Sequence, residues 1–144
     1  MFFKTWLCIQ VKAYEEGVDI LSYLIERKYL CPLHWGLFKP LEKQVRFEKL
    51  KEQNELLRSQ LQEKSEYKYE VFLPEGYTKV KKYPVFFTLH GDGKNIEHHK
   101  MFWKPDWLLS EGYIVVYLQS SQVSIYEGYL WMGKRMYLFK MLRK

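Results

Sequence analysis

The spacing of apolar residues changes along the chain from a helical period to a strand period. In the first 64 residues, apolar side chains recur every three or four positions, for example at Tyr14, Val18 and Leu21, which places them on one side of a helix. From residue 67 to residue 118 they alternate with polar residues or form short unbroken runs, as β-strands do. The pattern predicts a helical segment followed by an α/β segment.

Helices are predicted at residues 2–11, 14–28 and 41–64. The first two form a helical hairpin, and Gly17 marks a place where they pack closely. In the third helix, Asn54 lies in the apolar row, where it could fix the register of a coiled coil. That row covers only about three heptads, so we expect the helix to pack on its own chain. Residues 31–40 hold two prolines and a glycine and are expected to form a connector.

Strands are predicted at residues 67–73, 85–89 and 113–118. The first alternates, with Tyr67, Tyr69, Val71 and Leu73 on one face, and so predicts an outer strand. The other two are unbroken apolar runs, which is typical of strands covered on both faces in a parallel sheet flanked by helices.

A divided helix is predicted between the two apolar runs. Asn95 can cap it, and Pro105 separates two pieces at about 96–103 and 106–111. Gly112 ends the second piece. The apolar side chains expected to face the sheet are Trp103, Trp107 and Leu108.

Two short polar stretches follow the unbroken runs. His90, Gly91, Asp92 and Gly93 follow the first run, and Gln119, Ser120, Ser121 and Gln122 end and follow the second. A strand, a glycine corner and a helix in succession aim backbone N–H groups at an anion or an oxyanion. In open α/β sheets, ligands bind at the carboxyl ends of the strands, so both stretches are candidate site residues.

The residues around the first stretch resemble the start of an α/β-hydrolase domain of the esterase and dienelactone-hydrolase-like kind. The resemblance is carried by F-L-P-E-G-Y at 72–77, K-K-Y-P at 81–84 and L-H-G at 89–91, and it continues through residues 112–123 and an aromatic-rich loop at 126–131. It implies that the backbone N–H of Asp92 belongs to the oxyanion hole, that His90 orders the corner and that the loop at 126–131 reaches the site. It also implies a small-molecule ester or peptide as the substrate of the full-length relatives, and no cofactor.

The catalytic serine of that family is missing from the pattern. The nucleophile sits in a G-x-S-x-G turn. No serine of this chain has glycine both two residues before it and two residues after it. We therefore expect no catalytic serine, acid or histidine in the chain, and we interpret it as truncated or frame-shifted after residue 131. Residues 132–144 are interpreted as a basic tail.

The helical segment has a weaker resemblance. Residues 13–17 and 26–29 are similar to the second helix of a tetratricopeptide-type unit, although such repeats need about three copies to bury a core. Either the helices dock on the α/β segment or they end a longer helical array.

Composition narrows the classes of partner. The net charge is +6, and the basic residues after the last acid, Glu127, form the tail. No nucleic-acid motif accompanies them, and no apolar run is long enough to cross a membrane, so neither partner is expected. The two cysteines, Cys8 and Cys31, make no disulfide framework, which favours a reducing compartment and a cytoplasmic location.

Histidine and carboxylate residues gather near the corner, at His90, Asp92, Glu97, His98 and His99. Adjacent histidines on a helix point about 100° apart, and the spacing fits no zinc motif, so no metal is expected.

The expected fold class is α/β, a partial three-layer α/β-hydrolase sheet behind an N-terminal α-helical segment. The expected divisions are residues 1–64, 65–131 and 132–144. The expected function is that of a truncated relative of serine carboxylesterases and peptidases, inactive alone and able to self-associate through an exposed sheet edge. The alternative is a non-catalytic protein-interaction module built on the helical segment.

Overall fold

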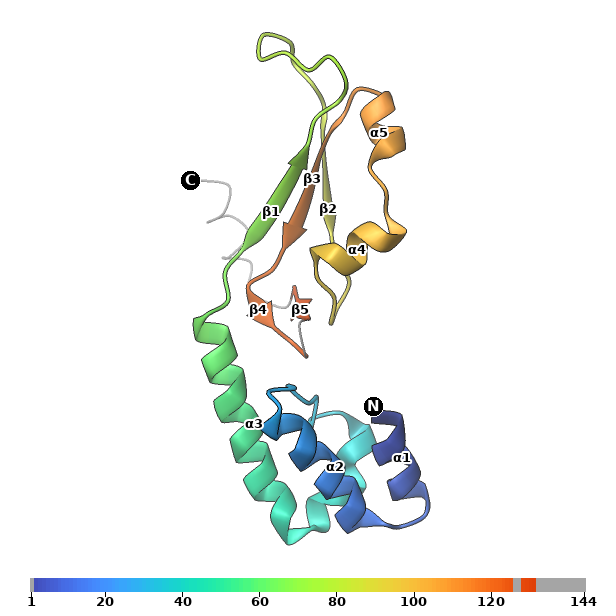
Figure 1. Ribbon diagram of the computed structural model, residues 1–144, viewed down its shortest axis with the longest axis vertical. Helices are drawn as coiled ribbons and strands as arrows, with labels where there is room; N and C mark the ends of the chain where they lie inside the picture. Colours follow the sequence, from blue (N-terminus) through green and yellow to red (C-terminus); the bar gives the residue numbers. More distant parts are fainter. Residues whose placement is uncertain (1, 126–127, 132–144) are drawn as a thin grey trace. The chain divides into compact units, whose positions relative to one another are not determined.

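The computed structural model describes residues 2–125 and 128–131, and it is a mixed α/β protein (Figure 1). The chain divides into two compact units. The first is Met1–Lys64 together with Val123–Tyr126, and the second is Ser65–Gln122 together with Glu127–Lys144. The basic tail at 132–144 and residues 126–127 of the aromatic loop lie outside the described residues.

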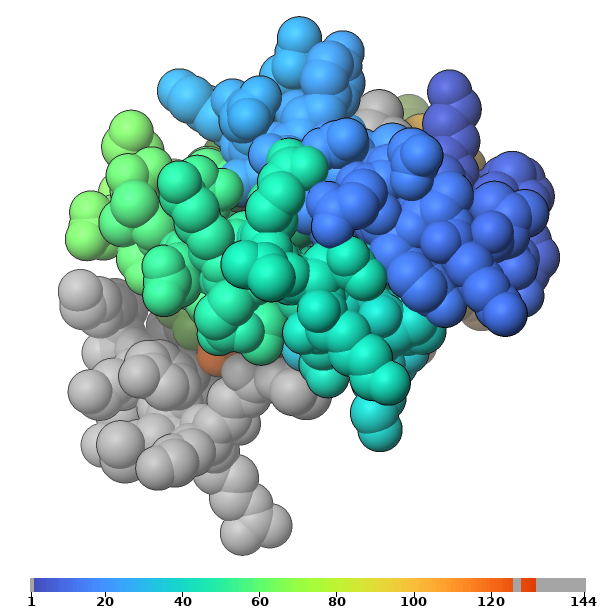
Figure 2. All heavy atoms as spheres, turned by 90° about the horizontal axis from the view of Figure 1, so that it is seen from below, coloured from blue at the N-terminus to red at the C-terminus, as the bar shows by residue number. Residues whose placement is uncertain are grey.

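The first unit is a group of helices around one apolar core. Its elements are α1 (Phe2–Gln10), α2 (Tyr14–Glu26), the 3₁₀ helix η1 (Gly36–Lys43) and α3 (Val45–Glu63). The most deeply buried apolar side chains come from α2, from residues 30–41 and from α3, and they are Val18, Leu21, Leu24, Leu30, Cys31, Phe38, Leu41, Phe47 and Leu50. Figure 2 shows the spheres of α2 and α3, blue and teal, packed side by side.

The hairpin of α1 and α2 is confirmed, with small changes at its ends. Gly17 is buried, and a Cβ built on it would lie 3.6 Å from Cβ of Cys8 on α1 and 3.4 Å from Cδ2 of Leu41 on η1. The close packing expected at this glycine is therefore confirmed. The second helix ends at Glu26 rather than at 28, because Lys28 takes a positive φ of 64°, which an α-helix does not continue through.

The α-helix expected from residue 41 begins four residues later. Residues 36–43 form η1, which holds Pro40, and Gln44 has an extended backbone with φ −82° and ψ 128°. That one extended residue separates η1 from α3. The connector expected at 31–40 is therefore partly helical, and Leu41 is buried as a residue of η1.

Asn54 holds the connector to α3. Its side chain is 1% exposed, its Oδ1 accepts from the backbone N–H of Cys31 and its Nδ2 donates to the carbonyl oxygen of Cys31, each over 2.9 Å. This polar residue in the apolar row therefore satisfies two backbone groups of its own chain. The expectation that the helix packs on its own chain is confirmed.

The second unit contains a three-stranded sheet in the order β1 (Lys68–Phe72), β3 (Ile114–Gln119), β2 (Val85–Leu89). β1 is antiparallel to β3, and β2 is parallel to β3. The connection from β2 to β3 carries α4 (Ile96–Phe102) and α5 (Asp106–Ser110), which lie along one face of the sheet (Figure 1). Short strands β4 (Gln122–Val123) and β5 (Tyr129–Leu130) form a two-stranded sheet.

Local signals set the ends of α4 and α5 as the sequence predicts. The side chain of Asn95 accepts from the backbone N–H of His98 over 2.9 Å, which is an N-cap bond. Pro105 lies between the two helices, and Gly112 follows with a positive φ of 81°. Of the three side chains expected against the sheet, only Leu108 is buried.

The expectation for Trp107 is wrong, since its side chain is 70% exposed. α5 has five residues, so it presents little more than one turn to the sheet, and Leu108 occupies that position. Trp103 is half exposed, although its ring stacks on Phe86 of β2 with centroids 6.3 Å apart.

The expectation that residues 85–89 are covered on both faces is also wrong. β2 is an edge strand among the described strands, and β3 is the central one. Phe86 and Thr88 point to the side of α4 and α5, whereas Val85, Phe87 and Leu89 are exposed on the other side. An unbroken apolar run fits burial on both faces, but the described residues place a helical layer on one face alone.

The core of the second unit lies between the sheet and its two helices. It is built from Ile96, Leu108, Val115 and Tyr117. The buried Tyr117 donates its hydroxyl to the carbonyl oxygen of Trp103 over 2.7 Å, at the end of α4. Among the helices that the structure describes, none has the length and apolar character needed to cross a membrane.

Candidate functional site at the carboxyl edge of the sheet

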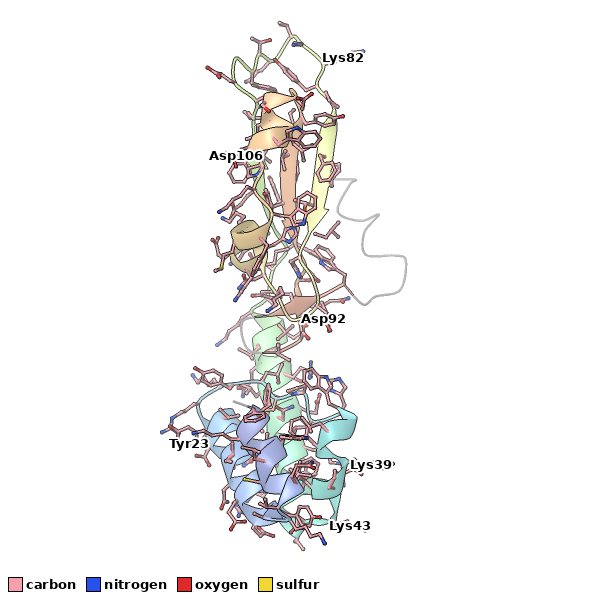
Figure 3. The ribbon with its side chains drawn as sticks, turned by 90° about the vertical axis from the view of Figure 1, so that its right-hand side faces the viewer. Tyr23, Lys39, Lys43, Lys82, Asp92 and Asp106 are labelled. Atoms are coloured by element: carbon pink, nitrogen blue, oxygen red, sulfur yellow. The ribbon has the colours of Figure 1, made fainter. Side chains whose placement is uncertain are left out.

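Both candidate stretches lie at the same edge of the sheet. Because β2 and β3 are parallel, their carboxyl ends meet at one edge. Residues 90–93 follow the end of β2, and residues 119–122 end and follow β3. Figure 3 shows Asp92 at this end of the second unit, opposite the loop that carries Lys82.

His90 joins the two stretches. Its side chain is 3% exposed, and its Nε2 accepts from the backbone N–H of Ser120 over 3.2 Å. Its Nδ1 lies 2.9 Å from the carbonyl oxygen of Gly91. A nitrogen that accepts an N–H carries no proton, so the proton is on Nδ1, which donates to Gly91. Both nitrogens of His90 therefore bond to backbone groups.

The corner is also held from residues 128–131. The N–H of Gly93 donates to Tyr129 O and the N–H of Tyr129 donates to Lys94 O, each over 2.9 Å. The indole N–H of Trp131 donates to His90 O over 3.0 Å, and the Trp131 ring lies 5.0 Å from the imidazole. Gly93 itself has a positive φ of 67°. Three hydrogen bonds to residues 129 and 131 thus hold the corner in place.

Glycine is required at residue 128 but not at residue 91. A Cβ on Gly128 would lie 2.5 Å from the carbonyl oxygen of Gly93, closer than atoms can approach. A Cβ on Gly91 would meet nothing within 4 Å, and the backbone there has no positive φ. Sterically, the described residues therefore leave room beside Gly91.

Gln119 fixes the start of α4 to the end of β3. Its side chain is 5% exposed, and its Oε1 accepts from the backbone N–H of Ile96 over 3.2 Å. That N–H lies in the first turn of the helix, where it has no partner within the helix. The side chain of Gln119 thus links the end of β3 to the start of α4.

A hollow of about 570 Å³ lies at this edge. Its lining comes from the start of β1, the start of α4, the end of β3 and β5. The residues are Tyr67, Lys68, Tyr69, Glu70, Asn95, Ile96, Glu97, Gln119 and Tyr129. The carboxylates of Glu70 and Glu97 both contact Nζ of Lys100, over 2.8 and 3.0 Å. No serine or cysteine is among these residues, so the hollow offers shape and polarity but no strong nucleophile.

The adjacent residues His98 and His99 have different surroundings. His99 points toward the sheet, where its Nε2 contacts Oγ1 of the buried Thr88 and its ring meets that of Tyr117 edge-on at 5.7 Å. His98 is exposed beside Asn95. Burial, and next the nearby His90, lower the pKa of His99, which favours its neutral form. Within residues 2–125 and 128–131, no group of three or more His, Cys, Asp or Glu side chains could hold a metal ion.

Two serine hydroxyls bond to backbone groups rather than to His90. Ser120 lies at the same edge, but its Oγ accepts from the backbone N–H of Gln122 over 3.0 Å. Ser110 has Gly112 two residues after it but Leu108 two residues before it, and it donates its hydroxyl to Trp107 O over 2.7 Å. Both nitrogens of His90 are already bonded to backbone groups. The base of a serine hydrolase must instead accept the serine proton, so His90 does not fill that role here.

Comparison of the chain with protein-family models, with curated proteins and with solved structures found no match. The hydrolase resemblance therefore rests on the residues of this chain. Sequence reasoning found the two stretches, and the resemblance implied that the loop at 126–131 reaches the site. It did not identify the bonds by which Gly128, Tyr129 and Trp131 hold the corner.

Proposed function

We propose that residues 65–131 are the first part of an α/β-hydrolase domain related to serine carboxylesterases and peptidases. In this role, residues 90–93 bind the oxygen of an acyl group through the backbone N–H of Asp92. The observation that carries the proposal is the bond between His90 and Ser120, which fixes the corner to the end of the neighbouring parallel strand. Oxyanion holes work because their donors are held in place before the charge develops.

Two further features support this role. The corner follows a strand and precedes a helix, which is the place of one oxyanion donor in α/β-hydrolases. The space beside Gly91 suits close approach of a ligand to the backbone.

The chain by itself does not catalyse hydrolysis in this proposal. Hydrolysis by a serine requires a nucleophile, a base, an acid that orients the base, and an oxyanion hole. Residues 90–93 supply part of the oxyanion hole. The Nε2 of His90 and the Oγ of Ser120 each accept a hydrogen bond from a backbone N–H instead of acting as base and nucleophile. The substrate class, a small ester or peptide, belongs to relatives that carry the remaining groups.

Titration of ¹⁵N-labelled chain with phenylphosphonate tests the corner directly. We expect the amide signals of residues 91–93 to shift more than those of the rest of the chain. The variant His90→Ala should lose these shifts, because the corner loses its bond to Ser120. The exposed His34→Ala serves as the control and should keep them. Shifts spread evenly over the chain, or equal shifts in His90→Ala, would count against the proposal.

A second candidate function is a protein-interaction module, and a groove on the first unit favours it. The groove measures about 690 Å³ and is lined by Phe3, Lys4, Asp19, Ile20, Tyr23 and Leu24 of α1 and α2. Phe3 is 65% exposed and stacks on Trp6. Tyr23 is also exposed, at the surface of the first unit (Figure 3). Peptides selected from a displayed library should lose binding to Ile20→Asp but keep binding to the control Leu56→Asp on α3. Equal loss in both variants would argue against the groove.

A further inference from the structure

The face of the sheet opposite α4 and α5 is apolar in every row. The register places Tyr69, Leu118 and Leu89 side by side, then Val71, Val116 and Phe87, then Ile114 beside Val85. Leu73 follows β1 on the same side. Tyr69, Phe87 and Val71 are 70%, 50% and 48% exposed. The helices and strands that the structure describes leave an apolar face of this extent uncovered on the second unit.

Charge is absent from this face. The only charged residues in the three strands are Lys68 and Glu70. Glu70 contacts Lys100 of α4, so it lies on the helix side, and Lys68 shares that side by the alternation of the strand. The exposed part of the apolar side chains amounts to about 600 Å², at the upper end of the patches on monomeric proteins, and such patches mark interaction sites.

We propose that this open face binds the same face of a second copy of the chain, so that two sheets pack as a sandwich. Two copies would bury roughly 1,200 Å² in total, which reaches the lower bound for a stable interface. Two sheet faces pack about 10 Å apart with their side chains interdigitated, and a two-fold axis needs a surface that complements itself. A face without charge meets its own copy with no repulsion between like charges.

Two other occupants are outcomes of the test. Residues 132–144 hold the uncharged run 136–139 between basic residues, and the crosslink described below tests this segment as the occupant. Association through the sheet edges β1 and β2 would extend the sheet but leave the apolar face open. A second copy covers the face with a surface whose strands carry no charged side chain on that side.

Sedimentation velocity of the full chain over a range of concentrations tests the proposal. We expect a dimer for the wild type, and dissociation constants raised about tenfold or more in Val71→Lys and Phe87→Lys, because each buries a charge at the interface. The matched control is Val80→Lys, at a loop residue that is 96% exposed, and it should dimerise as the wild type does. Circular dichroism of each variant checks that it is folded.

A photo-crosslink identifies the occupant even if a lysine variant unfolds. Benzoylphenylalanine replaces Phe87 in an equal mixture of ¹⁴N-labelled and ¹⁵N-labelled chains. Crosslinks between the two isotopes at residues 68–73 or 85–89 support the second copy. Crosslinks within one chain to residues 136–140 would overturn the proposal in favour of the tail. A monomer without crosslinks would overturn the proposal and show that the face is left uncovered. Assemblies that Phe87→Lys does not affect would overturn it in favour of pairing through the sheet edges.

Discussion

The imidazole Nε2 of His90 accepts a hydrogen bond from the backbone N–H of Ser120 over 3.2 Å, although the two residues are far apart in the sequence. The bond joins the carboxyl ends of β2 and β3, the neighbouring parallel strands. It also fixes the tautomer of His90, whose other nitrogen donates to Gly91. A single buried side chain thus determines where the glycine corner lies.

Removal of this imidazole should destabilise the second unit. In His90→Ala, the buried N–H of Ser120 loses its acceptor, which costs about 1–3 kcal/mol. The control His98→Ala removes an exposed histidine of the same region and should cost less than about 0.5 kcal/mol. Urea denaturation followed by tryptophan fluorescence measures both. Similar midpoints for the two variants would show that the bond does not hold the corner.

Gly128 should tolerate no larger residue. In Gly128→Ala, the new Cβ would lie 2.5 Å from Gly93 O, so the corner or residues 128–131 must move, at a cost of about 1–3 kcal/mol. Gly36→Ala is the matched control, since its Cβ would meet nothing within 4 Å. Thermal denaturation should give a lower Tm for Gly128→Ala alone. An unchanged Tm would mean that the contact between residues 93 and 128 is not formed in solution.

His99 should make stability depend on pH. Burial and His90 lower its pKa in the folded protein, so the unfolded chain, with a histidine pKa near 6.5, binds more protons as the pH falls. The stability that comes from neutral His99 is complete above about pH 6.5 and is lost as the pH falls through the folded pKa. Between about pH 7.5 and pH 5.5, the urea midpoint should fall more for the wild type than for His99→Gln. Parallel curves would show that His99 titrates alike in both states.

Asn54 should be the most sensitive polar residue of the first unit. Asn54→Ala leaves the N–H and the carbonyl of Cys31 without partners, which should cost about 2–4 kcal/mol. Gln53→Ala, its exposed neighbour, is the control. Burial raises the pKa of the Cys31 thiol to about 12, so alkylation by iodoacetamide gives a second measure. Cys31 should react faster in Asn54→Ala than in the wild type, and equal rates would contradict the role of Asn54.

Local signals in the sequence were enough to place α1 to α5 and β1 to β3, whereas η1, β4 and β5 were not predicted. Asn95, Pro105 and Gly112 set the ends of α4 and α5 through capping, a missing N–H and a positive φ, each of which acts within a few residues. The row of apolar residues that contains Asn54 could also be recognised from the sequence spacing. Boundaries that depend on packing could not, as the start of α3 at Val45 shows.

Exposure and contacts between distant residues were harder to predict. An unbroken apolar run such as residues 85–89 shows that a strand is apolar, but not how many of its faces are covered. The partners of the corner, Gly128 and Trp131, come from a segment more than thirty residues away, so only the resemblance, and no local pattern, indicated that they reach it. The candidate stretches were found because parallel strands end at one edge, which follows from chain order alone.

The most direct test of the account is whether any serine of the purified chain is a reactive nucleophile. A fluorophosphonate probe is added, together with a p-nitrophenyl ester assay, and each serine-containing peptide is examined by mass spectrometry. The account predicts no label and no turnover above the rate in buffer, since His90 and Ser120 bond to backbone groups rather than to each other. Stoichiometric labelling of a single serine, with Ser120 the first to examine, would contradict it.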